Sequence, residues 1–376
     1  MKAAQLLKGV AEQHLKTEST PTPGINGPYS DPETPVRNAA HWSITLFNLW
    51  QLTGEEKFRK GAEDWVELML SNEYRPNNVI FHHREKQGKD PTNGLIGQAW
   101  TLEALNKAAE KLGRKELNQL AINLIKAHPF DNRKGLWQRV DLSGKALGFD
   151  MAFNHQLWFA ASLAPFKEID GAVGKQVETF LHRVPKNMGQ YKSGLIFHLI
   201  ERNLGFKAHL YKALIKRAGN FNPFLPPSIG KKYASLQNQM HWKAIGYHAF
   251  NLYAFGMLKK HYPDHPVWNV FQIQNALDYL CSSSYREDIQ KEETYGFPYN
   301  PPGFEVPLVL HAFDIFPREE LIEEASWWLN QQIAMHFDKD TFSFGRNTND
   351  PATLNARIYE LSRWPDVLLE NVNVEV

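Results

Sequence analysis

Apolar positions recur at helical spacing in five paired stretches of the chain. Residues 41–70, 94–128, 151–184, 241–280 and 303–336 each hold two such stretches, joined by a short polar turn. The first stretch of each pair is apolar nearly all round, as in an inner helix, whereas the second carries more charge. Helix–turn–helix units of about 30 to 40 residues predict a helical array and not a βαβ fold.

Short apolar or aromatic pieces such as "GLWQRV" and "GLIFHL" separate the pairs and precede the inner helices. They predict short β-strands in the loops at one rim. Two further helical stretches, residues 3–16 and 353–363, remain at the ends of the chain, and pairing them closes a ring. We therefore expect an all-α fold, an (α/α)6 toroid of six helical hairpins. Residues 1–376 would form one domain, with the N-terminal helix paired with the last helix.

The composition is that of a folded globular protein, with 43% hydrophobic and 22% charged residues. A formal net charge of +1 gives no reason to expect nucleic acid or an anionic membrane as a partner. No apolar run is long enough to span a membrane, and the N-terminus lacks the pattern of a signal peptide. The single cysteine, Cys281, excludes an internal disulfide and zinc sites built on cysteine pairs. We expect a cytoplasmic protein, monomeric or homodimeric.

Candidate chemistry gathers where inner helices begin, because these starts face one central cavity in a toroid. The stretch "GFDMAFNH" places Asp150, Asn154 and His155 at such a start. Asp150 is either a helix N-cap or a general acid whose pKa an apolar wall raises. Asn154 would then hold the substrate and His155 would tune the acid. Glu305 is either a second catalytic carboxylate or a first-turn acid that complements the helix dipole.

Other candidates near inner-helix starts would bind a sugar: His41, His83, His198, His241 and Trp242. Arg346 and Arg357 could grip the carboxylate of a uronic acid, although Arg357 could instead pair within the chain with Asp350 or Glu360. No ligand spacing typical of a metal site, no P-loop and no dinucleotide-binding glycine motif occurs. We therefore expect no metal and no organic cofactor.

Two stretches carry a resemblance to a known family, "GLWQRVDLSGKALGFDMAFNHQLWFAASLA" and "GLIFHLI". They resemble the six-hairpin glycosidase superfamily, in particular the unsaturated glucuronyl and rhamnogalacturonyl hydrolases. By position, Asp150 matches the catalytic Asp of that family and His198 matches a histidine in its next strand. The chain departs from the family where a Trp-Ala-Arg-Gly-like motif would open the next inner helix, since Lys243 follows Trp242 there.

The resemblance implies a glycoside hydrolase of uronic-acid-containing, unsaturated glycuronyl oligosaccharides. Asp150, as a single general acid and base, would protonate the C4=C5 enol ether, and water would add at C5. Two alternatives remain open. An N-acylglucosamine 2-epimerase-like sugar isomerase would use two cavity histidines instead, and a glycan-binding or assembly protein would have no catalytic group at all.

Overall fold

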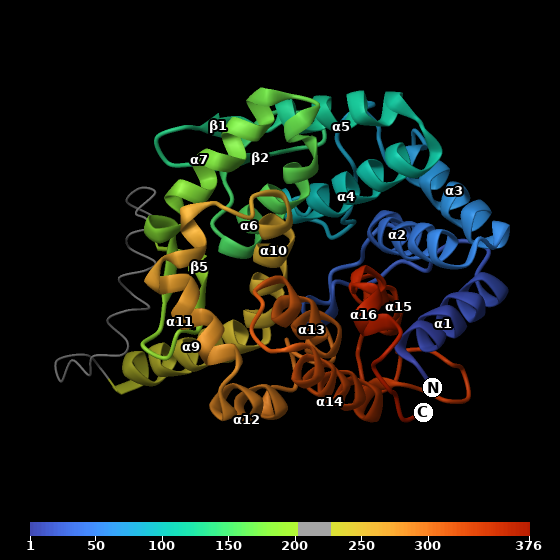
Figure 1. The fold of residues 1–376 in the computed structure, drawn as a ribbon. Coiled ribbons are helices and arrows are strands. Elements are labelled where there is room, and N and C mark those ends of the chain that lie inside the picture. Colours follow the sequence, from blue (N-terminus) through green and yellow to red (C-terminus); the bar gives the residue numbers. More distant parts are fainter. Residues whose placement is uncertain (202–226) are drawn as a thin grey trace.

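The computed structural model describes residues 1–201 and 227–376, and helical hairpins form a ring in it (Figure 1). The inner helices are α2 (Val36–Thr53), α4 (Gly94–Leu112), α6 (Phe153–Leu163), α10 (His248–His261), α13 (Pro302–Ala312) and α15 (Pro351–Ala356). Outside them lie α3 (Glu56–Leu70), α5 (Lys115–Ala127), α7 (Gly171–Asn187), α11 (Phe271–Leu280), α12 (Ser283–Lys291) and α14 (Arg318–His336). The predicted (α/α)6 toroid is confirmed.

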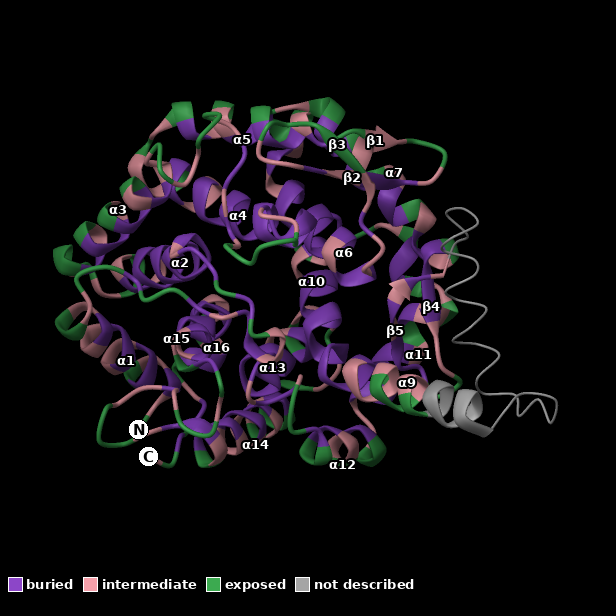
Figure 2. Cartoon of the chain, turned by 180° about the vertical axis from the view of Figure 1, so that it is seen from behind, coloured by how far each residue is buried: buried purple, intermediate pink, exposed green. Residues whose placement is uncertain are grey.

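Burial separates the two layers of helices. Figure 2 shows the inner helices buried almost throughout, whereas the outer helices expose the face that points away from the ring. In α5, for example, only Leu117, Ala121, Ile122, Leu124 and Ile125 are buried. Each large apolar side chain that is buried in this way contributes about 1.5–3 kcal/mol, so the one-sided pattern is enough to hold an outer helix in place.

The two ends of the chain lie side by side (Figures 1 and 2). The N-terminal amine donates to Val374 O at 3.0 Å, and Ala3 N donates to Val372 O at 3.1 Å. Helix α1 (Ala3–Thr17) contacts α2 and the short α16 (Asp366–Leu369). The helix expected at 353–363 is divided into α15 and two 3-10 turns, Arg357–Tyr359 and Leu361–Arg363. That the whole chain is one domain stays a prediction.

In the described residues, short strands form at two of the predicted places, the segment before α6 and the segment after α7, and not before every inner helix. Strands β1 (Phe130–Asp131), β2 (Leu136–Val140) and β3 (Ala146–Phe149) form an antiparallel sheet, and β4 (Met188–Gln190) pairs with β5 (Ile196–Ile200). β3 ends directly before Asp150, and a bridge joins Ala152 to Leu199 of β5. The bridge therefore brings the start of α6 next to the strand that carries His198.

One predicted boundary is wrong. The fourth inner helix does not start near residue 240, because α9 (Pro227–Gly246) continues through that stretch. The chain turns at Tyr247, and the inner helix α10 begins at His248. His241 and Trp242 therefore lie on α9, which contacts β5 and α10 from outside the ring of inner helices. Among the described residues, no helix has an apolar stretch that is long enough to cross a membrane.

Candidate functional site

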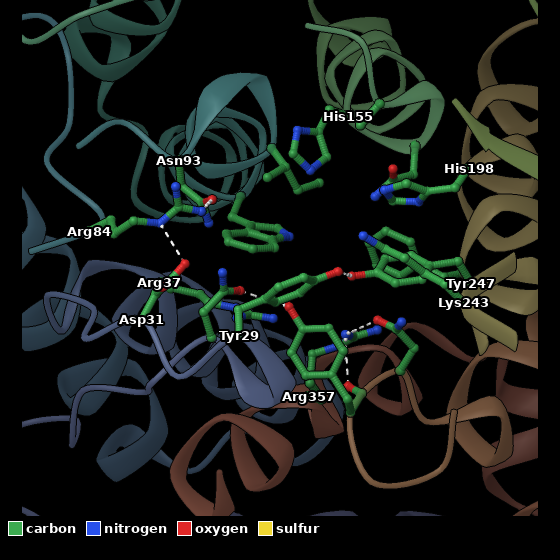
Figure 3. A pocket seen from close by; sticks show the side chains of 18 of the residues that line it. Tyr29, Asp31, Arg37, Arg84, Asn93, His155, His198, Lys243, Tyr247 and Arg357 are labelled. Atoms are coloured by element: carbon green, nitrogen blue, oxygen red, sulfur yellow. Dashed lines mark hydrogen bonds and ion pairs between the residues drawn. The ribbon is translucent and has the colours of Figure 1, made fainter. Parts of the chain in front are cut away.

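A pocket of about 160 Å³ opens at the N-terminal ends of the inner helices (Figure 3). Its wall combines charged groups, imidazoles, tyrosines and amides. The polar and aromatic members are Asn26, Tyr29, Asp31, Arg37, Arg84, Lys89, Asn93, Trp100, Asn154, His155, His198, Lys243, Tyr247, Phe250, Tyr299, Asn300 and Arg357. Since pockets for drug-sized ligands are typically larger, about 300–1,000 Å³, this one suits a small ligand or one unit of a longer one.

Asp150 and His155 form a hydrogen-bonded pair beside the pocket. His155 Nδ1 lies 2.8 Å from Asp150 Oδ2, and His155 lines the pocket while Asp150 stands behind it. Burial opposes the charge on Asp150, but the charge and hydrogen bond of His155, the charge of Arg139 and the backbone N–H of Ala152 together outweigh it, so the pKa of Asp150 is below its ordinary value. A carboxylate in this position fixes the imidazole with Nδ1 as donor and leaves Nε2 able to accept a proton.

Asp150 is not the N-cap of its own helix. Helix α6 has Ala152 as N-cap, with no side-chain cap. Instead, Oδ2 of Asp150 accepts the N–H of Leu95 at 3.2 Å, in the first turn of α4, and Oδ1 accepts the N–H of Ala152 at 3.2 Å. The side-chain hydrogen bonds of Asp150 thus orient it toward His155 and connect the start of α6 to the start of α4.

His198 is the second imidazole of the pocket. It stands on β5, is 9% exposed, and its Nδ1 has no hydrogen-bond partner. Burial, with the positive charges of Lys243 and His155, holds the pKa of His198 well below its ordinary value. His198 is therefore a neutral imidazole at physiological pH. In Figure 3 it lies beside His155, above the pair formed by Tyr29 and Tyr247.

Asn154 and the tyrosines give the pocket a polar and aromatic lining. Asn154 is 2% exposed, and its Oδ1 lacks a partner, which leaves it available to a ligand hydroxyl. The hydroxyls of Tyr29 and Tyr247 lie 3.0 Å apart, and Tyr299 donates to Asn26 Oδ1 at 2.8 Å. Rings with a polar tip suit a ligand that has both apolar faces and hydroxyl groups, as sugars do.

Arg357 lines the pocket, but its donors are used within the protein. Its Nη2 contacts Glu305 Oε1 at 2.6 Å and Glu360 Oε1 at 2.5 Å, and Nε contacts the same Glu360 oxygen. Nη1 donates to Tyr299 O and Asn300 Oδ1. The internal pairing of Arg357 with Glu360 is thus confirmed. Because five bonds occupy its five N–H groups, no donor remains to form a fork with a ligand carboxylate.

Glu305 and Arg346 do not reach the pocket. Glu305 is buried against Arg357, and burial together with Glu360 raises its pKa well above the ordinary value. It belongs to a buried ion cluster and is not placed to act with Asp150. Arg346 is exposed and donates to the backbone carbonyl of Ala334, so its guanidinium stabilises a surface loop.

Four further candidates are not among the described residues that line this pocket: His41, His83, His241 and Trp242. His41 is stacked on Tyr359 with ring centres 4.0 Å apart, and His83 Nε2 is bonded to Thr101 at 2.9 Å. The rings of His41 and His83 both contact Trp100, so they support the wall from behind. On α9 successive side chains point about 100° apart, so Lys243 faces the pocket while Trp242 and His241, one and two positions before it, point elsewhere.

Lys243, Tyr247, Arg84 and Lys89 line the pocket without having been among the sequence candidates. A signal existed for Lys243, since it stands where the chain departs from the Trp-Ala-Arg-Gly-like motif. The other three stand in loops or at a helix junction, where no periodicity marks them. In the part of the chain that the structure describes, no group of three or more His, Cys, Asp or Glu residues is placed to hold a metal ion.

A comparison with known proteins identifies a relative, archaeal glycosylation protein Q from Haloferax volcanii. It is 38% identical over 379 residues, which cover 96% of this chain and 97% of that protein. The chain belongs to the same family. No family model matches the sequence.

Solved structures with the same architecture include the cellobiose 2-epimerase from Bacillus thermoamylovorans B4167, at a TM-score of 0.62 and 10% identity over 96% of this chain and 98% of that one. An unsaturated glucuronyl hydrolase specific for heparin matches at a TM-score of 0.60 and 11% identity, over 96% of each chain. A D-mannose isomerase matches at 0.59 and 11%, over 96% and 98%. The resemblance to the six-hairpin glycosidase superfamily is confirmed as a fold that hydrolases and epimerases of sugars share.

Proposed function

We propose that this member of the glycosylation protein Q family is a carbohydrate-active enzyme that moves protons on a sugar bound in the pocket. His155 would be the base and His198 a hydrogen-bond donor to the reacting oxygen. The observation that carries the proposal is the pair formed by Asp150 and His155 beside a neutral His198. The name of the relative, a glycosylation protein, also supports a sugar or glycan as substrate.

The two imidazoles suit a sugar isomerase or epimerase. His155 Nε2 would take the proton from the carbon beside the carbonyl of an open-chain sugar. The electron pair of that C–H bond would become a C=C bond, and the electron pair of the C=O π bond would move to the carbonyl oxygen, whose negative charge the hydrogen bond from His198 would stabilise. Return of the proton from His155 to the other face of the same carbon gives the epimer, whereas its return to the former carbonyl carbon, with transfer of the neighbouring hydroxyl proton to the former carbonyl oxygen, gives the isomer. Asp150 would remain ionised throughout and stabilise the charged form of His155.

Proton exchange with solvent tests this proposal directly. Candidate free sugars such as glucose, mannose and N-acetylglucosamine are incubated with the protein in D2O, and proton NMR follows the C2–H signal. We expect loss of that signal with the native protein, and a large decrease in rate for His155→Gln and His198→Gln. The control is His311→Gln, because His311 is exposed and lies at the C-terminal end of α13. Binding of a sugar without any exchange would overturn the isomerase and favour a glycan-binding protein.

A hydrolase of unsaturated glycuronyl oligosaccharides is the second candidate. It is favoured by the position of Asp150, directly after β3 and before α6, which matches the position of the catalytic Asp in the resemblance. In this structure the imidazole and not the carboxylate faces the pocket, so His155 would supply the proton to the C4=C5 bond. The assay is loss of the ultraviolet absorbance of that bond with oligosaccharides cut by a lyase. Loss of absorbance without deuterium exchange would establish the hydrolase instead of the isomerase.

A further inference from the structure

The cations that line the pocket differ in whether a carboxylate compensates them. Asp31 accepts Lys89 at 2.8 and 2.7 Å and lies 3.5 Å from Arg84 Nε. Arg37 is paired with Glu33 at 3.3 Å. Arg357 is bound by the carboxylates of Glu305 and Glu360. Among the residues that the structure describes, none with a carboxylate is bonded to Lys243, which leaves its charge without a compensating partner.

Aromatic rings surround the ammonium group of Lys243. Its Nζ lies 4.9 Å from the ring centre of Tyr29 and 5.7 Å from those of Tyr247 and Tyr295. Ring faces attract a cation, but each such contact is worth only about 0.5–2 kcal/mol, whereas removal from water costs several. The attraction of the rings does not offset the cost of removing the ammonium from water, because burial lowers the pKa of Lys243 to about 8. A bound anion would offset the remaining cost.

A free hydroxyl donor stands beside Lys243. In the pair formed by Tyr29 and Tyr247, one hydroxyl donates to the other, so the accepting hydroxyl keeps its own hydrogen for a ligand. Burial raises the pKa of both tyrosines well above the ordinary value, so both remain protonated donors. An ammonium and a hydroxyl that meet in this way match the charge and the acceptor oxygens of a carboxylate or phosphate.

We propose that Lys243 and the hydroxyls of Tyr29 and Tyr247 form an anion subsite, and that the pocket takes a sugar that carries a carboxylate or phosphate group. This inference rests on the proposed function for the sugar part of the ligand. It assigns recognition of the anion to Lys243, in place of the arginines from which the sequence led us to expect it. Lys243 would position the sugar so that its reacting carbon faces His155, without itself taking part in proton transfer.

Calorimetric titration with glucuronate, glucose 6-phosphate and glucose distinguishes recognition of the charged group from recognition of the sugar ring. We expect the native protein to bind at least one of the two acidic sugars more tightly than glucose. Lys243→Met should weaken binding of that acidic sugar about 10- to 100-fold, the usual range for a hydrogen bond to a charged group, and leave glucose unchanged. Lys243→Arg should retain the preference. Lys126→Met, on the exposed face of α5, is the matched control and should bind as the native protein does.

Each outcome decides the proposal. A preference for glucuronate or for glucose 6-phosphate that disappears in Lys243→Met supports it and tells which group is the ligand. Equal affinity of acidic and neutral sugars, or a preference that survives in Lys243→Met, overturns the anion subsite. The deuterium exchange assay then shows whether the proposed function still stands. If none of the three sugars binds and no sugar exchanges deuterium, both proposals are wrong. The melting temperature of each variant shows whether it has folded. If Lys243→Met has not folded, the native protein is compared with Lys243→Arg instead.

Discussion

Asp150 Oδ2 accepts hydrogen bonds from two inner-helix starts, from Nδ1 of His155 on α6 at 2.8 Å and from the backbone N–H of Leu95 on α4 at 3.2 Å. One carboxylate oxygen therefore orients the imidazole and fixes the start of the neighbouring inner helix, α4. Burial opposes the charge on Asp150, but the contact with His155, together with Arg139 and the N–H of Ala152, holds the pKa of Asp150 below its ordinary value. Asp150 thus acts as an ionised group that positions His155, a different role from that of a proton donor.

Asp150→Asn should reduce the rate of deuterium exchange on the order of 10²–10⁴-fold while the fold is retained. The reason is that an amide can present its N–H groups to Nδ1 and so stabilise the tautomer that lacks a free acceptor at Nε2. NMR in D2O measures the rate, and circular dichroism checks the fold. Asp170→Asn is the control, because Asp170 is an N-cap of α7 and accepts the N–H groups of Ala172 and Val173. An undiminished rate in Asp150→Asn would show that the carboxylate has no positioning role.

Gly94→Ala should disturb the pair formed by Asp150 and His155 from the side of α4. Gly94 has φ +63°, and a Cβ at this position would clash with Asp150 Oδ2 and lie 3.3 Å from His155 Nδ1. Gly113, after the other end of α4, has φ +67° and nothing within 4 Å of such a Cβ. Both variants should lose about 1 kcal/mol of stability to backbone strain, but only Gly94→Ala should also lose exchange activity. Chemical denaturation and the NMR assay measure the two effects, and equal activity of the two variants would contradict the expectation.

Arg357→Met should cost about 3–5 kcal/mol of unfolding free energy, because Glu305 and Glu360 would then be buried without a counter-charge. Burial already raises the pKa of Glu360 to about 7. Below pH 7 Glu360 is protonated in both folded proteins, whereas above it only the native protein has Arg357 to stabilise the ionised form, so the deficit of the variant should grow between pH 7 and 9. Urea denaturation at several pH values measures it. The control is Arg346→Met, which should change stability by no more than about 0.5 kcal/mol.

The ring of hairpins can be predicted from the sequence because each hairpin is a local unit with its own apolar periodicity. The strand that precedes Asp150 and the strand that bears His198 can also be predicted. Local periodicity does not reveal where one helix stops and the next begins when a single residue separates them, which is why the start of α10 at His248 was missed. Nor does it reveal which charges are already paired, since Arg357 and Glu305 are 52 residues apart. Location in the cell and oligomeric state stay predictions.

Affinity for an acidic sugar should fall as pH rises above about 8, the pKa of Lys243 in the free protein. Below this pH the ammonium is already charged, so binding requires no proton. Above it, binding must be coupled to uptake of one proton, and the dissociation constant should rise by about tenfold per pH unit. The other titratable groups that face Lys243 do not follow this profile: burial raises the pKa of Tyr29, Tyr247 and Tyr295 above the ordinary value and lowers that of His198.

Calorimetry between pH 7 and 9.5 measures how steeply the dissociation constant changes with pH. Lys243→Arg should bind with no such slope, because arginine stays charged throughout this range. If the dissociation constant of the native protein depends on pH as that of Lys243→Arg does, another group causes the pH dependence. The profile would then no longer support Lys243 as the group that binds the anion.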